Sequence, residues 1–200
     1  MIKDAYTVQT AEKILQAATQ LFALYGYDSV SIKQITELAG VNSALISYYY
    51  RGKKNLYLSV LSSQMEVFKG LIEAINAQKI TPLEKLMSYV NALAKFQSEN
   101  PNHVQLIYRE ILSPQPMFED FVKTKLYCLH IFMKDLVAEA VKVGELKTPI
   151  APTHVAFTLE GIILFYFLMH REIRELGDFQ PGEEEQYLDE ALTSYLKSLK

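Results

Sequence analysis

The chain has 200 residues, half of them apolar, which suffices for a substantial core in one large domain or two smaller ones. Its net charge of −3 argues by itself against a nucleic-acid partner, but the charge is unevenly distributed. Residues 1–60 carry six basic and four acidic side chains, giving +2, so the remaining residues carry −5. A mildly basic end on an acidic body suits a protein that contacts phosphate at one end only.

The single cysteine, Cys128, excludes an intramolecular disulfide and fits a reducing cytoplasm. The first ten residues lack the basic start and apolar run of a signal peptide. The most apolar stretch, residues 155–169, contains Glu160 and is shorter than a bilayer requires. We therefore expect a soluble protein located in the cytoplasm.

Apolar residues recur at the helical period in nearly every segment, and no alternating strand pattern is sustained. The sequence therefore predicts an all-α fold of about nine helices. The first helix ends at Gly26, a residue suited to a left-handed helix stop. Its apolar stripe consists of Ile14, Ala18, Leu21, Phe22 and Tyr25.

Ser31 and Gln34 form a capping-box pair that opens a second helix, and Gly40 ends this helix. Its inward side chains are predicted to be Ile32, Ile35 and Leu38. Asn42 or Ser43 caps a short third helix. The other helices are predicted at about residues 53–77, 82–98, 103–112, 117–143, 153–176 and 183–199.

Residues 31–50 contain two short helices separated by a sharp turn at Gly40-Val41, as a helix-turn-helix requires. Val41, Ile46 and Tyr50 are predicted to pack the second of these helices onto the first helix of the chain. This packing leaves six side chains facing away: Ser43, Ala44, Leu45, Ser47, Tyr48 and Tyr49. A short helix with small and aromatic residues outward can enter the major groove of DNA.

Three basic residues, Arg51, Lys53 and Lys54, stand where the fourth helix begins. Because a helix N-terminus carries partial positive charge, each should cost about 0.3–1 kcal/mol unless an anion is near. A DNA phosphate would turn this cost into attraction. A solvated basic corner is the alternative, and this feature alone favours neither.

The segment AEKILQAATQLFALYGYDSVSI, followed by ITELAGVNSALISYYYRGKKNLY, resembles the DNA-binding domain of the TetR family of bacterial repressors. The resemblance covers about residues 8–60, and the turn glycine, the recognition helix and the following lysine recur in register. The chain departs from the usual family pattern at five positions: Thr36, Leu45, Ser47, Tyr49 and Tyr50.

By position, the resemblance implies nine DNA-contacting residues: Ser31, Lys33, Ser43, Ala44, Leu45, Ser47, Tyr48, Tyr49 and Lys53. The first two are expected near backbone phosphate, with Lys33 also within reach of a base edge. Ser43, Ala44 and Leu45 are expected to read bases, where Leu45 can meet a thymine methyl group. The two tyrosines and Lys53 are expected to hold phosphate.

The motif NPNHVQLIYREILSPQPMFEDF, at residues 100–121, resembles the CecR-type branch of the same family. The resemblance implies a helix-turn-helix domain at residues 8–68 and a helical effector-binding and dimerisation domain at residues 69–200. In the family the last two helices pair with their copies. Because apolar residues cover more than one face of the helix at 153–176, we expect a homodimer on a pseudo-palindromic operator. Burial of that helix within one chain is the alternative.

The family's effector pocket lies between the middle helices, and aromatic walls with a few polar groups suit a small apolar or amphipathic effector. The candidate residues are Phe96, His103, Tyr108, Arg109, Tyr127, His130, Phe165 and His170. Each has an ordinary alternative role: core packing for the phenylalanines, surface or core hydrogen bonding for the histidines, and ion pairing for the arginine. Release of the operator by the effector is the family's common behaviour.

The chain carries no hydrolase, P-loop or zinc-protease motif. Cys128 and His130 are two residues apart and point to different sides of a helix, and a helix-breaking Asn-Pro separates Glu99 from His103. No enzymatic activity, cofactor or metal is therefore predicted. The alternative to a regulator is a TetR-like helical protein that does not bind DNA and acts through protein contacts. A steep loss of duplex affinity with rising salt would distinguish the two.

Overall fold

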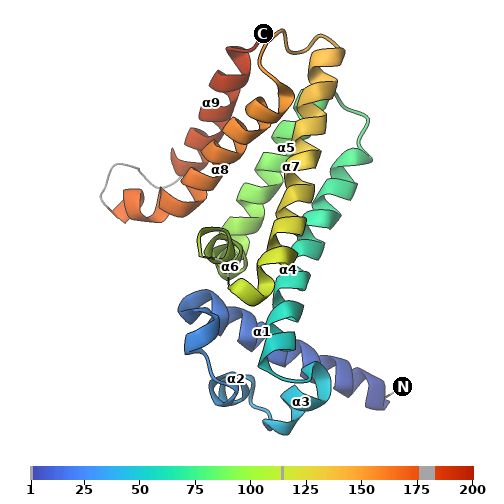
Figure 1. Ribbon diagram of the computed structural model, residues 1–200, viewed down its shortest axis with the longest axis vertical. Coiled ribbons are helices and arrows are strands. Elements are labelled where there is room, and N and C mark those ends of the chain that lie inside the picture. Colours follow the sequence, from blue (N-terminus) through green and yellow to red (C-terminus); the bar gives the residue numbers. More distant parts are fainter. Residues whose placement is uncertain (1, 114, 176–182) are drawn as a thin grey trace. The chain divides into compact units, whose positions relative to one another are not determined.

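The computed structural model describes residues 2–113, 115–175 and 183–200 (Figure 1). These residues form nine α-helices and one 3-10 helix, η1, with no strand among them, so the all-α prediction is confirmed. The helices are α1 Ile2–Ser29, α2 Ile32–Ala39, α3 Ala44–Tyr50, α4 Lys53–Asn76, α5 Pro82–Glu99, α6 Pro101–Leu112, η1 Pro116–Phe118, α7 Glu119–Lys142, α8 Pro152–Glu175 and α9 Glu183–Lys197.

Contacts divide the chain into two compact units. Unit 1 comprises Met1–Phe68 and Gln97–Lys123, and unit 2 comprises Lys69–Phe96 and Thr124–Lys200. α6 therefore belongs to the same unit as the two short helices α2 and α3, although it follows them by some fifty residues in the chain. Within unit 1, α1 packs against both α2 and α6.

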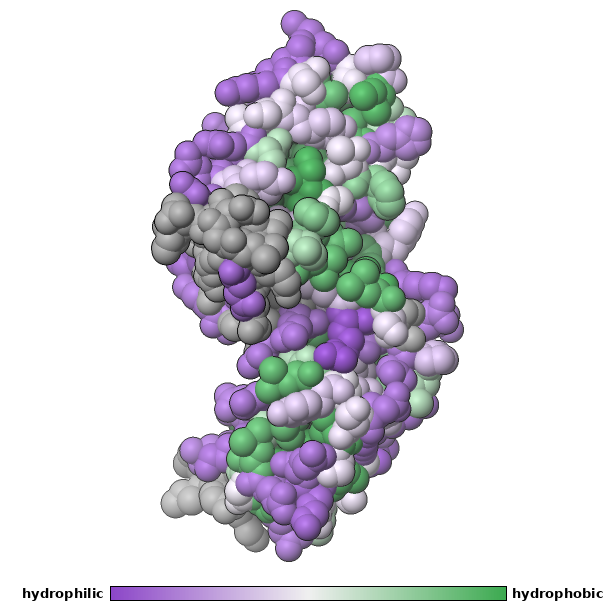
Figure 2. Space-filling model, turned by 90° about the vertical axis from the view of Figure 1, so that its left-hand side faces the viewer, coloured by the Kyte–Doolittle hydropathy of each residue, from purple (hydrophilic) through white to green (hydrophobic). Residues whose placement is uncertain are grey.

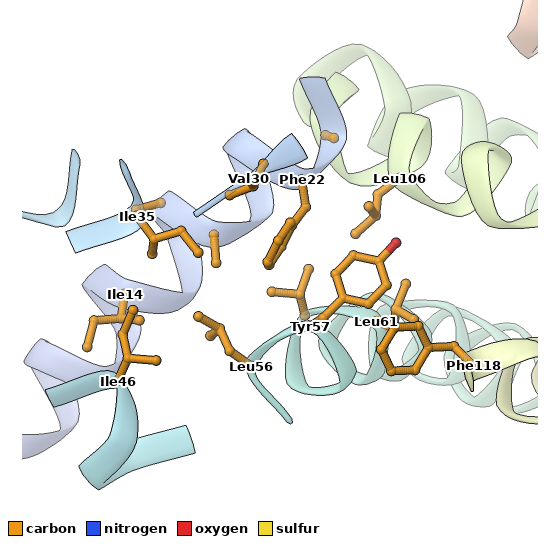
Figure 3. Packing of buried hydrophobic residues seen from close by; sticks show 14 residues of the cluster. Ile14, Phe22, Val30, Ile35, Ile46, Leu56, Tyr57, Leu61, Leu106 and Phe118 are labelled. Atoms are coloured by element: carbon orange, nitrogen blue, oxygen red, sulfur yellow. The ribbon is translucent and has the colours of Figure 1, made fainter. Parts of the chain in front are cut away.

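The core of unit 1 is a continuous apolar cluster drawn from α1, α2, α3, α4, α6 and η1 (Figure 3). Its centre is aromatic: the Tyr57 ring lies 4.8 Å from the rings of both Phe22 and Phe118, and 5.0 Å from the ring of Tyr27. Edge-to-face and tilted ring pairs at such distances add to the gain from burial alone. This cluster fixes the short helices, which are too short to be stable by themselves.

Local signals set the helix ends in unit 1. The capping box at Ser31 and Gln34 is present, and Gly40 ends α2, both as predicted. Gly40 does so in the left-handed conformation, with φ 65°. Gly26, with φ 78° and ψ 168°, breaks α1 one turn before its end, so the predicted stop appears as a kink. Side chains with such a φ are strained, which explains why glycine occupies both positions.

Two residues predicted to face inward do not. Tyr25 is 57% exposed, because α1 is broken directly after it. Leu38 is 49% exposed, because the buried side of α2 runs through Ile35 and Thr36 instead. The Thr36 hydroxyl donates to the carbonyl oxygens of Ile32 and Lys33, so this departure from the TetR pattern is satisfied within its own helix.

Unit 2 is a set of long helices whose buried residues come mainly from α5, α7, α8 and α9, with Ile75 near the end of α4. The Tyr89 ring on α5 meets the Phe132 ring on α7 at 5.1 Å, edge to face. Between α7 and α8, His130 Nδ1 lies 3.0 Å from a carboxylate oxygen of Glu160. α8 and α9 pack side by side (Figure 1).

α8 is the most apolar helix, and by length and composition its first eighteen residues could cross a membrane. Core helices of soluble proteins pass the same test, and several of its large side chains are buried in unit 2: Val155, Leu159, Ile163, Tyr166 and Phe167. Its opposite face is unusual, since Phe157 is 73% exposed and Phe165 is 56% exposed. In Figure 2, which faces the side of α8 and α9, hydrophobic atoms are visible among hydrophilic ones.

Candidate nucleic-acid interface

The turn between α2 and α3 is held by backbone hydrogen bonds. The Gly40 amide donates to Glu37 O at 3.3 Å, and the Val41 amide donates to Thr36 O at 3.0 Å, which together close the end of α2. Asn42 Oδ1 accepts from the Ala44 amide at 2.8 Å, whereas Ser43 makes no side-chain cap. Of the two predicted caps, Asn42 is therefore the one that starts α3.

α3 is anchored on one side only. Ile46 is fully buried in the core, and the Tyr50 hydroxyl donates to the Ala11 carbonyl oxygen of α1 at 2.7 Å. Burial raises the pKa of the Tyr50 phenol, and the charge of Glu12 raises it further, so the group is a neutral donor at ordinary pH. The predicted inward roles of Ile46 and Tyr50 are confirmed.

The opposite side of α3 is exposed. Ser43, Ala44, Ser47 and Tyr48 are all exposed, and the Tyr48 side chain is 74% exposed. At 100° per residue, Ala44 and Tyr48 lie roughly opposite Ile46. Small side chains around one open aromatic ring leave the helix slim enough to approach a groove.

Leu45 and Tyr49 were predicted to face away with these residues, and this was wrong in part. Both are half-buried against the core of unit 1. They stand four residues apart on the flank of the buried stripe, so their apolar parts complete the core while their edges stay open. The Tyr49 ring also meets the Tyr48 ring edge to face, at 4.9 Å.

The residues predicted on α2 are both exposed. The Ser31 hydroxyl is engaged in the capping box, where it accepts from the Gln34 amide at 3.2 Å. Lys33 pairs with Glu37 at 3.8 Å across one turn, with both side chains more than half exposed. Such surface pairs contribute little, so phosphate can compete for this lysine.

Basic groups gather between α3 and α4. Arg51 is exposed and closes α3 in the left-handed conformation, with φ 58°, the one positive φ at a non-glycine residue in the described part of the chain. Lys54 is exposed in the first turn of α4, which holds no acidic residue. Neither residue was among the nine predicted DNA contacts, although the sequence pattern connected both with a DNA phosphate at the start of this helix.

Lys53 differs from these two cations because it is half-buried. Its Nζ lies 4.3 Å from the centre of the Tyr27 ring and 3.5 Å from the Asp28 carbonyl oxygen. Burial lowers the pKa of its ammonium, and the charge of Asp28 acts in the opposite direction. The cation is thus held at a fixed place by α1 residues, which the sequence pattern did not reveal.

The predicted effector residues are spread over both units. Phe96 is half-buried in unit 2, whereas Tyr108 and Arg109 belong to unit 1. Arg109 donates to the carbonyl oxygens of Ala23 and Leu24, both at 3.2 Å, so it serves the end of α1 instead of a pocket. The side chains of His103 and His170 lie outside the part of the chain that the structure describes.

Three further effector candidates lie in unit 2. Tyr127 and Phe165 are 62% and 56% exposed, so neither forms a pocket wall within the single chain. His130 is half-buried and bonded on both ring nitrogens, to Glu160 at 3.0 Å and to Thr153 Oγ1 at 3.0 Å.

Unit 2 also has an open groove of about 580 Å³ between the α4–α5 connection, α5 and the end of α9. It is lined by Gln78, Ile80, Leu83, Glu84, Met87, Ser88, Asn91, Thr193, Leu196, Lys197 and Lys200. None of the predicted effector residues is among them.

Comparison with known proteins decides the family. Residues 14–60 match the profile of the bacterial regulatory proteins of the tetR family, and residues 81–198 match the C-terminal domain of the transcriptional dual regulator CecR. The chain belongs to the TetR family. It is a DNA-binding transcriptional regulator, and the resemblance seen in the sequence is confirmed.

Relatives match the regulator over most of its length. The transcriptional regulator YttP of Bacillus subtilis is 27% identical over 178 residues, covering 88% of this chain and 86% of that protein. RutR of Escherichia coli is 30% identical over 146 residues, covering 73% and 68%. The fold matches the crystal structure of AibR in complex with isovaleryl coenzyme A and operator DNA, with a TM-score of 0.74 at 19% identity, covering 92% of this chain and 96% of that one.

Proposed function

We propose that this regulator binds a pseudo-palindromic operator as a homodimer and leaves it when a small apolar or amphipathic effector binds. The observation that carries DNA binding is the one-sided anchoring of α3. Its buried side is fixed by Ile46 and Tyr50, while small side chains and Tyr48 are open on the other side. A recognition helix needs this combination of rigidity and exposure.

Within this proposal the outward residues Ser43, Ala44 and Ser47 meet base edges, and Leu45 offers its open edge to a thymine methyl group. Tyr48 and Tyr49 contact the DNA backbone, and the Tyr49 side chain is fixed by its packing against the core of unit 1. Ser31, Lys33 and Lys53 contact phosphate as the family position implies. We add Arg51 and Lys54 to this set, since Arg51 is exposed at the end of α3 and Lys54 is exposed in the first turn of α4.

The homodimer is supported by the open face of α8. Phe157, Gly161 and Phe165 are spaced by four residues, so they form one exposed stripe. A Cβ at Gly161 would meet no atom within 4 Å, so the backbone itself is accessible between the two rings. Single exposed apolar residues are common, but two phenylalanines on one stripe favour a second copy as the occupant.

Release by an effector is supported by the family and by relatives that bind one, such as AibR with isovaleryl coenzyme A. Within unit 2, His130 between α7 and α8 is the best-placed polar candidate, since it already links the two helices. Phe96 is the apolar candidate that is half-buried in the same unit.

DNA binding is tested by titrating the purified protein against duplexes selected from random sequence, at several salt concentrations. The logarithm of affinity should fall steeply with the logarithm of salt, because each phosphate contact releases a counterion. Tyr48→Ala should weaken binding by about tenfold or more, whereas Tyr25→Ala, which changes another exposed tyrosine, on α1, should not. A protein that binds no duplex, or binds without salt dependence, would instead support a role through protein contacts.

The homodimer is tested by sedimentation at several concentrations. Gly161→Leu should block the close approach of two α8 helices and yield monomers that keep their helix content. Gly70→Leu, in another helix where a Cβ also meets nothing within 4 Å, is the matched control. A wild-type chain of monomer mass at all concentrations contradicts this part of the proposal.

A further inference from the structure

Three residues contact helices α1 and α4 of unit 1 from the chain segment around the end of α6. They are Arg109 and Glu110 in α6, and Gln115 shortly after it. Arg109 caps the carbonyl end of α1 at Ala23 and Leu24, where a cation also meets the negative end of the helix dipole. A Cβ at Gly26 would stand 2.9 Å from Arg109 Nη1, so the glycine makes room for the guanidinium.

Glu110 is the second of these residues, and it is only 2% exposed. Its carboxylate accepts the Tyr57 hydroxyl of α4 on one oxygen and the Gln115 backbone amide, at 3.2 Å, on the other. Burial raises the pKa of the Tyr57 phenol, and the hydrogen bond to Glu110 raises it further, so Tyr57 remains a donor. The position of Gln115 is therefore fixed against the aromatic centre shown in Figure 3.

Gln115 is the third, and its side chain extends the connection to α1. Its Nε2 donates to Asp28 Oδ2 at 3.0 Å. Asp28 follows Tyr27, whose ring lies under the Lys53 ammonium, and the Asp28 carbonyl oxygen is 3.5 Å from the same Nζ. The Asp28 carboxylate, whose charge acts on the ammonium of Lys53, is thus engaged by the side-chain amide of Gln115.

The Asp28 carboxylate and a DNA phosphate would compete for the ammonium group of Lys53. A carboxylate close to an ammonium neutralises it and lowers its attraction for phosphate. A carboxylate whose oxygen is engaged by an amide donor, and whose backbone is fixed, stays where it is. Lys54, one residue later, is exposed, and its ammonium group is not fixed over an aromatic ring as that of Lys53 is.

We propose that Gln115 is a positioning residue for DNA binding: it holds the Asp28 carboxylate away from Lys53, so that Lys53 meets DNA phosphate from its place over Tyr27. This inference rests on the proposed DNA contact of Lys53 and adds a residue outside the helix-turn-helix to the determinants of affinity. Arg109 fixes α1, which carries Asp28, and Glu110 fixes the backbone of Gln115. Both partners of the hydrogen bond between Gln115 and Asp28 are therefore held in place.

The test is a set of variants of the full chain, measured for affinity to a selected duplex. Gln115→Ala should weaken binding about three- to tenfold, the effect of one polar contact. Gln105→Ala, which changes an exposed glutamine of α6, should leave affinity unchanged. In the Lys53→Ala background, Gln115→Ala should have no further effect, because the residue through which it acts is gone.

A second variant separates positioning from simple structural support. Asp28→Asn in the Gln115→Ala background should restore affinity, since the competing charge is removed while the side-chain shape is kept. Thermal unfolding of every variant shows whether the fold is intact. Wild-type affinity in Gln115→Ala, a full effect in the Lys53→Ala background, or no restoration by Asp28→Asn each overturns the inference. Failure of the wild-type chain to bind any duplex would instead overturn the proposed function.

Discussion

The two units differ in the polar groups that they bury and in the phenylalanines that they expose. All five buried polar or charged residues found in the described part of the chain lie in unit 1: Thr10, Thr19, Thr36, Gln64 and Glu110. Unit 2 instead places two phenylalanines on its exterior, at Phe157 and Phe165. Buried polar groups specify one arrangement of helices, whereas exposed apolar groups leave surface for a partner.

This contrast indicates that unit 1 serves to fix a geometry and unit 2 serves to offer a surface. Unit 1 must hold α3 and the basic groups at one geometry for DNA, and its internal hydrogen bonds serve that purpose without help from a second chain. Unit 2 leaves Phe157 and Phe165 of α8 exposed, and the proposed homodimer places the second copy there. Each of the following predictions tests one side of the comparison.

The largest difference is expected between removal of a buried phenylalanine ring in unit 1 and removal of an exposed one in unit 2. Phe22 is fully buried, so Phe22→Ala should lower the free energy of unfolding by about 3–5 kcal/mol. Phe157→Ala removes the same atoms from a site that is 73% exposed, and should change protomer stability by about 0.5 kcal/mol or less. Thermal unfolding at several protein concentrations separates this small change from weakened dimerisation. Equal losses at low concentration would remove the distinction between the units.

The next largest effect concerns the buried hydrogen bond of unit 1. Glu110→Leu leaves the Tyr57 hydroxyl and the Gln115 amide without their acceptor, which should cost about 2–3 kcal/mol. Adding Tyr57→Phe should recover part of that loss, because the unsatisfied hydroxyl is removed as well. Chemical denaturation of the single and double variants measures this coupling, and Glu99→Leu, an exposed position, is the control. Additive losses would show that Glu110 and Tyr57 do not act as a pair.

Sequence reasoning succeeded where the signal was local. The capping box at Ser31, the end of α2 at Gly40 and the burial of Ile46 each depend on neighbours within a few residues, and each was predicted correctly. The phase of α3 was also right for Tyr48 and Tyr50. It was wrong at the flank, because a helix of seven residues cannot show from its pattern how wide its buried stripe is.

The roles of Arg109 and Lys53 could not be predicted in the same way. Arg109 contacts carbonyls 85 and 86 residues earlier in the chain, and no local pattern encodes that pairing. The family resemblance pointed to a pocket for Arg109 and to free phosphate contact for Lys53. Only the fold shows that Arg109 caps α1 and that Lys53 lies over Tyr27.

A smaller effect should distinguish two of the positive-φ glycines of unit 1, Gly26 and Gly40. Gly26→Ala meets both an unfavourable φ and the Arg109 guanidinium, whereas Gly40→Ala meets only the unfavourable φ, with no atom within 4 Å. We expect a loss of about 1 kcal/mol for Gly40→Ala and a loss of about 2 kcal/mol for Gly26→Ala. Denaturant titration checks the order. A reversed order would mean that Arg109 moves aside without cost and does not hold α1.

The smallest effect is expected in unit 2, at the Glu160 carboxylate of α8. Burial raises the pKa of Glu160 above its usual value, while the hydrogen bond and charge of His130 act against the rise. Tyr89 is the other titratable group coupled to it, and burial keeps that phenol neutral. Because the folded state binds the Glu160 proton more tightly than the unfolded chain does, the stability from this group is present below its usual pKa and is lost as pH rises through the raised value.

Glu160→Gln removes this titration and keeps the shape of the side chain. The unfolding free energy of the wild type minus that of the variant should therefore decrease as pH rises from about 4 to 7, by less than about 1 kcal/mol. Urea titrations at each pH measure the difference, and Glu139→Gln, an exposed change on α7, should show no such trend. A difference that grows with pH would mean that the ion pair with His130 outweighs burial. In that case unit 2, like unit 1, would be held together by an internal polar contact.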